Sequence, residues 1–255
     1  MPRPAPVPPV SYALSHVLAI PLLLALLAVA AQRSGLDMAI ARALYDPASA
    51  QFPLRHAAWL EWIGHRLLVA LPVAMALAAL AGALASYRYP AWRPARGALW
   101  AVVLTCLAGQ AIVMQLKHHT TMPRPYNLEV FGGDTPWPAH WWTLARAAAG
   151  NALPSAHAGA GYALLALYFA GRALGGGRWR WWGLAAGIAA GLACSLVRIL
   201  QGAHFLSQTL WSAAVMWLVA SLAFYPVLAG RFSRRPRPGS CRTARRHARN
   251  RASAR

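Results

Sequence analysis

Long apolar blocks separated by short polar segments constrain this chain more than any other feature. A helix that crosses a bilayer needs about 20 mostly apolar residues. Six blocks reach or approach that length: Tyr12–Ala31, Leu67–Ala85, Gly97–Leu116, Pro154–Gly171, Trp181–Val197 and Phe205–Ala229. Only 12% of the residues are charged, against about 25% in a soluble domain. The sequence therefore predicts an all-α polytopic membrane bundle with six transmembrane helices, and it excludes an ordinary soluble or disordered protein.

The distribution of basic residues predicts how this bundle lies in the membrane. If the spans alternate in direction, 17 of the 25 Lys and Arg residues fall on one side and all five acids on the other. Basic residues are enriched on the cytoplasmic side of membrane proteins. We therefore expect a bacterial inner-membrane protein with both termini in the cytoplasm. Its parts would be a cytoplasmic segment 1–10, a six-span membrane domain 11–229 and a disordered Arg-rich tail 230–255.

The Arg-rich tail bears on the expected partners of the protein. The formal net charge is +20, and ten arginines lie between Arg231 and Arg255. A basic segment next to a membrane span is attracted to anionic lipid headgroups. Because no nucleic-acid-binding fold accompanies the charge, we expect lipid partners and no nucleic acid. The sequence leaves the oligomeric state open.

Two features of the predicted outer loops suggest contact with the membrane surface. Apolar residues recur at helical spacing within Leu36–Leu44, which predicts an amphipathic helix in the interface. Trp137, Trp141 and Trp142 form an aromatic cluster. Such a cluster is typical of an interfacial belt, and lining a lipid entrance is the alternative.

Five ionisable residues border the spans on the predicted outer side. Lys117 ends the third block and Arg124 follows it, His157 lies at the start of the fourth, Arg198 follows the fifth, and His204 precedes the sixth. Helices that alternate in direction place all of these positions at one membrane face. Three permanent cations with two imidazoles predict an anion site, and phosphate suits the arginine fork and the lysine point charge.

The same segments predict chemistry as well as binding. Ser155 stands where a helix N-cap is expected, and the N–H groups of that helix start would add anion donors. Of two histidines beside a phosphoryl group, one can attack phosphorus while the other protonates the leaving oxygen. This arrangement requires no cofactor and no metal, and the three cysteines show no metal-ligand spacing.

The polar segments resemble the signature of the type 2 phosphatidic acid phosphatase (PAP2) family, which also includes vanadium haloperoxidases. That signature is Lys, six residues and Arg-Pro, then Pro-Ser-Gly-His, then Ser-Arg, five residues, His, three residues and Asp. The matching residues here are Lys117, Arg124, Pro125, Pro154, Ser155, His157, Arg198 and His204. Their order and the six-span layout also match, so the resemblance covers roughly residues 11–229.

The resemblance implies a role for each matching polar residue. It implies phosphate binding by Lys117, Arg124, Ser155 and Arg198. It also implies that His204 is the nucleophile and His157 the general acid.

Three positions depart from the signature, and one of them affects the chemistry. The departures are Ala156 for Gly, Val197 for Ser and Gln208 for Asp. Gln208 follows His204 by four residues and shares its helix face, but it lacks the charge of Asp. Charge-assisted hydrogen bonds are about twice as strong as neutral ones. We therefore expect a weakened activity, unless Glu129 or Asp134 supplies the missing carboxylate.

The expected function is removal of a terminal phosphate from a lipid phosphate or pyrophosphate at the periplasmic face, through a phospho-histidine. A lipid phosphotransferase that uses the same intermediate is one alternative. A catalytically silent lipid-binding or transport protein is the other, and Gln208 keeps it open. The sequence does not choose among prenyl pyrophosphate, phosphatidic acid, phosphatidylglycerol phosphate and lipid A as substrates.

Overall fold

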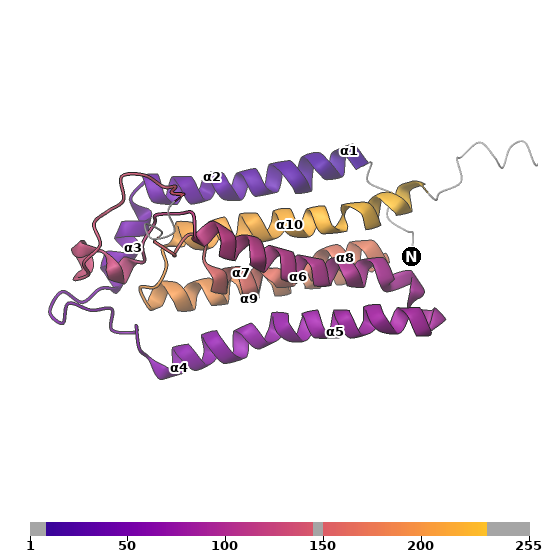
Figure 1. Cartoon of the computed structure of the whole chain (residues 1–255), viewed down its shortest axis with the longest axis horizontal. Coiled ribbons are helices and arrows are strands. Elements are labelled where there is room, and N and C mark those ends of the chain that lie inside the picture. The colour runs from indigo at the N-terminus through magenta and orange to yellow at the C-terminus, as the bar shows by residue number, and fades with distance from the viewer. Residues whose placement is uncertain (1–8, 145–149, 234–255) are drawn as a thin grey trace, which may run out of the picture.

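Long helices lie side by side along the longest axis of the molecule (Figure 1). The computed structural model describes residues 9–144 and 150–233, and the secondary structure within these ranges is helical, without strands. The α-helices are α1 (Pro9–Tyr12), α2 (Ile20–Arg33), α3 (Leu36–Leu44), α4 (Ala58–Glu61), α5 (Val69–Arg88), α6 (Arg96–Lys117), α7 (Ala156–Tyr162), α8 (Ala166–Leu174), α9 (Trp179–Leu200) and α10 (Leu206–Ser233). Shorter π or 3-10 segments are η1 (Ala13–Ala19), η2 (Trp62–Leu68), η3 (Pro90–Ala95), η4 (Pro125–Asn127), η5 (Glu129–Phe131) and η7 (Ala163–Leu165). The predicted all-α class is therefore confirmed.

Five helical runs among the described residues are long and apolar enough to cross a membrane. They are Val10–Arg33, Ala58–Arg88, Pro90–Lys117, Trp179–Leu200 and Leu206–Ala229. The second run begins at Ala58, nine residues before the predicted Leu67, because α4 and η2 continue into α5. These runs indicate a membrane protein, whereas the count of six spans stays a prediction.

The predicted fourth span forms α7, η7 and α8 in succession and is not among the five runs. Most of its side chains are buried, and it contacts α5, α6, α9 and α10. A helix enclosed by other helices faces little lipid, so its sequence can carry glycines and polar residues that a lipid-facing helix avoids.

Two glycines let α7 and α9 approach closely. A Cβ atom at Gly161 would lie 2.6 Å from the carbonyl oxygen of Ala190, and one at Gly191 would lie 2.1 Å from the Tyr162 ring. Small residues at such contacts are typical of membrane helix pairs. This packing fixes α7 against the helix that ends in Arg198.

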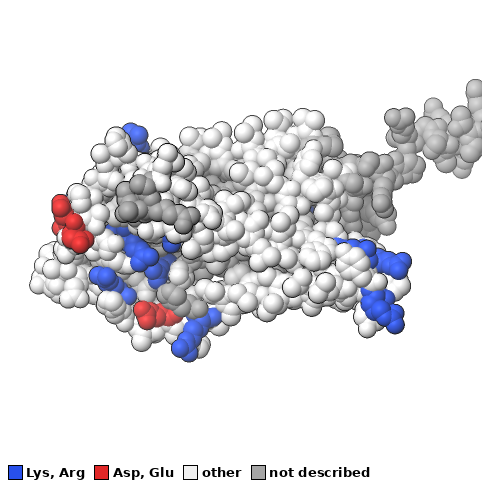
Figure 2. Space-filling model, viewed as in Figure 1, with Lys and Arg blue, Asp and Glu red and all other residues white. Residues whose placement is uncertain are grey.

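The two ends of the bundle differ in charge. On the face drawn in Figure 2, Lys and Arg lie at both ends, Asp and Glu only at the end that carries α3 and the loops, and the middle is uncharged. Helix α3, predicted from its spacing, is confirmed at Leu36–Leu44. Helix α1 and the C-terminal end of α10 lie at the opposite end (Figure 1). Segment 1–8 and the Arg-rich tail from residue 234 lie outside the described residues.

Candidate functional site

Hydrogen bonds join three distant segments at the end of the bundle that carries α3. The Ser155 N–H, just before α7, donates to the Gln208 carbonyl of α10 at 3.2 Å. The Ser212 hydroxyl donates to the Ser155 carbonyl at 2.8 Å. Gln208 Nε2 donates to the Pro123 carbonyl, in the loop after α6, at 3.0 Å. The predicted meeting of these segments is therefore present.

His204 lies at the centre of this site and is almost fully buried, with 3% of its surface exposed. Its Nδ1 is 2.9 Å from Gln208 Oε1. The orientation of the Gln208 amide is determined by backbone groups, because Oε1 accepts from the Phe205 N–H at 3.2 Å while Nε2 donates to Pro123. Since Oε1 is an acceptor only, His204 Nδ1 carries the proton and donates it. In the neutral ring the lone pair is therefore on the remaining nitrogen, Nε2.

The electrostatic surroundings keep this imidazole neutral. Burial lowers the pKa of His204 well below its ordinary value, and the positive charges of Arg198, Lys117 and Arg124 lower it further. The hydrogen bond with Gln208 raises the pKa; it is a smaller influence than burial but a larger one than the charge of any single cation. All three predicted cations thus lie close enough to His204 to act on its charge, and they would equally attract a phosphate.

The lowered pKa of His204 predicts that the loss of activity on acidification begins at a lower pH than an ordinary histidine would give. A histidine in the unfolded chain takes up a proton near pH 6.5, whereas folded His204 stays neutral to lower pH. Its contribution to stability is therefore present above about pH 6.5 and is lost as the pH falls toward the folded pKa. We expect kcat/KM to hold as the pH falls to about 6.5 and to decline only below it.

The measurement is kcat/KM against pH for two substrates whose phosphate pKa values differ. An acid limb shared by both substrates belongs to the enzyme. A shared limb at or above pH 6.5 would contradict the neutral His204 inferred from the site.

The cations enter the site from separate elements and are held by their neighbours. Arg198, in the last turn of α9, donates through Nη1 to Gln201 Oε1 at 2.9 Å, while its buried Nε has no hydrogen-bond partner. Arg124 donates through Nη1 to the Tyr126 hydroxyl. Lys117 is half-buried at the end of α6. An unpartnered buried donor such as the Arg198 Nε is a ready contact for an anion.

Ser155 is the N-cap of α7, as predicted. It is fully buried, its backbone is extended, and its hydroxyl accepts from the Ala158 N–H at 3.4 Å. His157 follows within the first turn of the same helix and is half-buried. Both residues therefore lie at the end of the bundle where His204 lies.

The two acids proposed as substitutes for the missing carboxylate lie at the surface. Glu129 and Asp134 are both exposed. The group that His204 Nδ1 meets is the Gln208 amide. The structure thus gives no support to a carboxylate from either residue.

Asp37 is a site residue that the sequence reasoning missed. It projects from α3, is 1% exposed, and accepts the Ser207 N–H at 2.9 Å and the Ser207 hydroxyl. Burial raises the pKa of Asp37, and the hydrogen bonds from Ser207 oppose this. An acid on the buried face of an amphipathic helix is the signal that could have found it. Asp37 caps the start of α10 through Ser207, which lies between His204 and Gln208 in the sequence. It therefore holds the segment that carries both residues.

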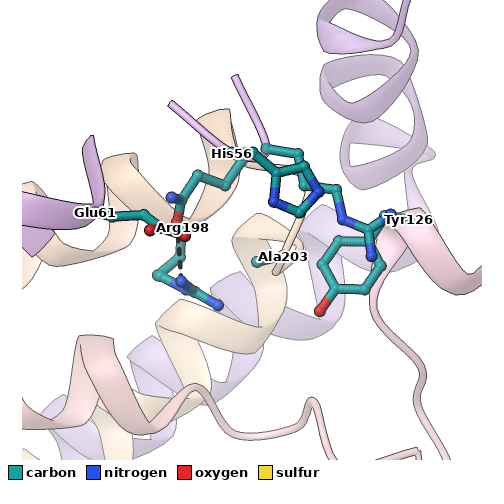
Figure 3. Close-up of a pocket in the computed structure, with 7 residues that line it drawn as sticks. His56, Glu61, Tyr126, Arg198 and Ala203 are labelled. Carbon is teal, nitrogen blue, oxygen red and sulfur yellow. Dashed lines mark hydrogen bonds between the residues drawn. The ribbon is translucent and has the colours of Figure 1, made fainter. Parts of the chain in front are cut away.

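A pocket of about 260 Å³ opens beside Arg198. Its lining residues are Arg55, His56, Glu61, Tyr126, Arg198, Gln201 and Ala203. Figure 3 shows Glu61 and Arg198 on one side of the gap and Tyr126 on the other, with His56 between them. The pocket is thus a polar extension of the site toward the loop before α4.

The predicted tryptophan cluster borders the site on another side. The Trp137 ring meets the edge of Phe205, next to His204, with the ring centroids 6.0 Å apart. Trp137 also lines an apolar pocket of about 350 Å³ with Met38 and Leu128. Trp142 stacks on His119 instead, at 5.3 Å. The structure therefore places Trp137, rather than the whole cluster, beside the site.

Comparison with known proteins covers the segment that builds this site. A sequence model of the PAP2 superfamily matches residues 97–231, which is more than half of the chain and includes every residue from Lys117 to Gln208. Searches of curated proteins and of solved structures found no match. Within residues 9–144 and 150–233, no group of three or more His, Cys, Asp or Glu side chains is placed to hold a metal ion.

Proposed function

The chain belongs to the PAP2 superfamily, and from that premise we propose that it is a membrane lipid phosphate or pyrophosphate phosphatase acting through a phosphorylated His204. Membership indicates phosphatase-type activity, because the family generally hydrolyses phosphate esters. One observation carries the mechanistic part of the proposal: the buried His204 imidazole, whose Nδ1 meets Gln208 Oε1 at 2.9 Å, lies within reach of the charges of three cations.

The first step transfers the phosphoryl group to the enzyme. His204 Nε2 forms a bond to phosphorus, the bond between phosphorus and the leaving oxygen breaks, and His157 donates a proton to that oxygen. Charge on the transferred group is stabilised by Lys117, Arg124 and Arg198. His204 becomes positively charged as it is phosphorylated, and Gln208 Oε1 stabilises that charge through the proton on Nδ1.

The second step releases phosphate. His157, now neutral, removes a proton from a water molecule that attacks the phosphorus of phospho-His204, and the bond from phosphorus to Nε2 breaks. The same cations hold the departing phosphate. The lipid tail stays in the bilayer while its headgroup enters the polar site.

We place the site at the periplasmic face of a bacterial inner membrane, with both termini cytoplasmic. The uneven distribution of Lys and Arg supports this orientation. On the drawn face the acids lie at the end with α3, opposite α1 and the C-terminal end of α10 (Figures 1 and 2).

Gln208→Asp is expected to raise the rate of phosphate release about five- to tenfold, because a charged acceptor strengthens the hydrogen bond to the phosphorylated imidazole by roughly 1 kcal/mol. Asp is shorter and cannot donate to the Pro123 carbonyl, so the free energy of unfolding should fall by about 1 kcal/mol. Gln208→Asn is the matched control, since it shortens the side chain without adding charge. Rates and melting temperatures are measured together, and the absence of a gain for Asp over both Gln and Asn would contradict this role.

Two alternatives remain. The same phospho-histidine would allow transfer of the phosphoryl group to a lipid hydroxyl, which would make the protein a lipid phosphotransferase. Because residue 208 is an amide and not a carboxylate, the other alternative is a lipid-binding or transport protein without catalytic activity. Purified protein is supplied with lipid phosphates labelled in the terminal phosphate, including a prenyl pyrophosphate, phosphatidic acid, phosphatidylglycerol phosphate and lipid A. Label in inorganic phosphate supports the phosphatase, and label in a second lipid supports the transferase. Label that stays in every substrate would overturn both enzymatic functions.

A further inference from the structure

The polar pocket beside Arg198 has a second cation that the proposed chemistry does not use. Arg55, from the loop before α4, lines this pocket, and its guanidinium lies over the Tyr126 ring at 3.8 Å from the centroid. Stacking on an aromatic face leaves the N–H groups at the edge of a guanidinium available for anions. Arg55 is therefore held in place, and the N–H groups at the edge of its guanidinium can donate hydrogen bonds to an anion.

Tyr126 connects this pocket to the phosphate-binding cluster. Its ring carries Arg55 on one face, and its hydroxyl accepts a hydrogen bond from Arg124. Arg198 is shared by the pocket and the phosphate-binding cluster, because it lines the pocket and its charge also lowers the pKa of His204. A ligand group in the pocket would therefore lie next to a phosphate held near His204.

The size and the charge of the pocket fit a second phosphate group. A cavity needs about 10–15 Å³ to hold one water molecule, so the volume of about 260 Å³ leaves room for a phosphate group. The charged side chains of the pocket and the adjoining cluster are Lys117, Arg124, Arg198, Arg55 and Glu61. Four cations and one carboxylate leave an excess of three positive charges. A terminal phosphate carries about −1.5 to −2 at neutral pH, and a second phosphate in a diphosphate ester adds about one more.

We propose that this pocket binds the second, lipid-linked phosphate of a lipid diphosphate, and that Arg55 is the residue that recognises it. The inference rests on the proposed function and names its substrate class. In the reaction, His204 Nε2 forms its bond to the terminal phosphorus. The bond from that phosphorus to the bridging oxygen breaks, the electron pair goes to the oxygen, and His157 donates its proton there. Arg55 stabilises the negative charge that builds up on the lipid-linked phosphate as this bond breaks, and the lipid monophosphate departs.

The test compares farnesyl diphosphate with farnesyl monophosphate, because the two substrates share one tail and differ by one phosphate. We expect the parent protein to prefer the diphosphate in kcat/KM. Arg55→Gln should lower kcat/KM for the diphosphate at least tenfold more than for the monophosphate, and Arg55→Lys should retain part of the preference. Arg42→Gln, at an exposed arginine of α3, is the matched control and should leave the preference unchanged.

Equal losses on both substrates, no loss on either, or a parent protein without a preference would overturn the assignment of Arg55 while leaving the phosphatase function intact. Failure of the proposed function looks different, because the parent protein would then release phosphate from neither substrate. If Arg55→Gln does not fold, competition in the parent protein decides. Inorganic diphosphate should then inhibit farnesyl monophosphate hydrolysis at a concentration at least tenfold lower than inorganic phosphate does, and equal inhibition would contradict the second phosphate site.

Discussion

Replacing His204 with alanine is expected to lower phosphate release by a factor of about 10³ or more, because the change removes the proposed nucleophile and with it the proposed covalent intermediate. The structure accounts for the size of this effect. Burial and three nearby cations keep the imidazole neutral, and the Gln208 amide holds the proton on Nδ1. In the variant a water molecule would have to attack phosphorus directly, and unlike the imidazole it would neither be held in position nor have a lone pair fixed in direction.

The measurement for His204→Ala is release of labelled phosphate, together with trapping of a phosphorylated protein by rapid alkaline quench. The parent protein should give label on the chain and the variant none. His140→Ala, at an exposed histidine of the same side of the bundle, is the control and should behave as the parent. Equal phosphate release by His204→Ala and the parent would remove the nucleophile assignment.

Arg198→Gln is expected to lower kcat/KM by about 10²- to 10³-fold, which is the typical cost of removing one donor that stabilises the charge of a transition state. The buried, unpartnered Nε and the effect of this arginine on the charge of His204 place it beside the reacting group. The glutamine keeps polarity but loses the positive charge and the fork of donors.

Arg198→Lys separates charge from geometry, since it keeps the charge and loses the fork, and its activity should fall between those of the parent and Arg198→Gln. Arg33→Gln, at the exposed arginine that ends the first membrane run, is the control. A loss smaller than about threefold for Arg198→Gln would show that this residue does not stabilise the transferred phosphate.

Much of this molecule follows from local pattern. The apolar blocks predicted the long helices, because a segment surrounded by lipid must be apolar on most of its surface. The spacing within Leu36–Leu44 predicted α3, and the residue before an apolar block predicted the Ser155 cap. The positions of Lys117 and Arg198 at the ends of blocks predicted that they would lie at one face, since successive spans alternate in direction.

The fourth block shows where pattern is insufficient. Its sequence predicted a short span, and α7 and α8 are enclosed by other helices. Whether a helix faces lipid or protein depends on which neighbours pack against it, and the composition of one segment does not report its neighbours.

The sequence alone determined which ionisable residues border the apolar blocks and at which end of the bundle they gather. Only the tertiary structure decided how they are held. The proton on His204 depends on Gln208, whose amide is oriented by Pro123, 85 residues earlier in the chain. The start of α10 depends on Asp37, 170 residues from Ser207. A hydrogen bond between residues so far apart forms only when the packing of whole helices brings donor and acceptor within about 3 Å, and no local pattern in the sequence encodes that distance.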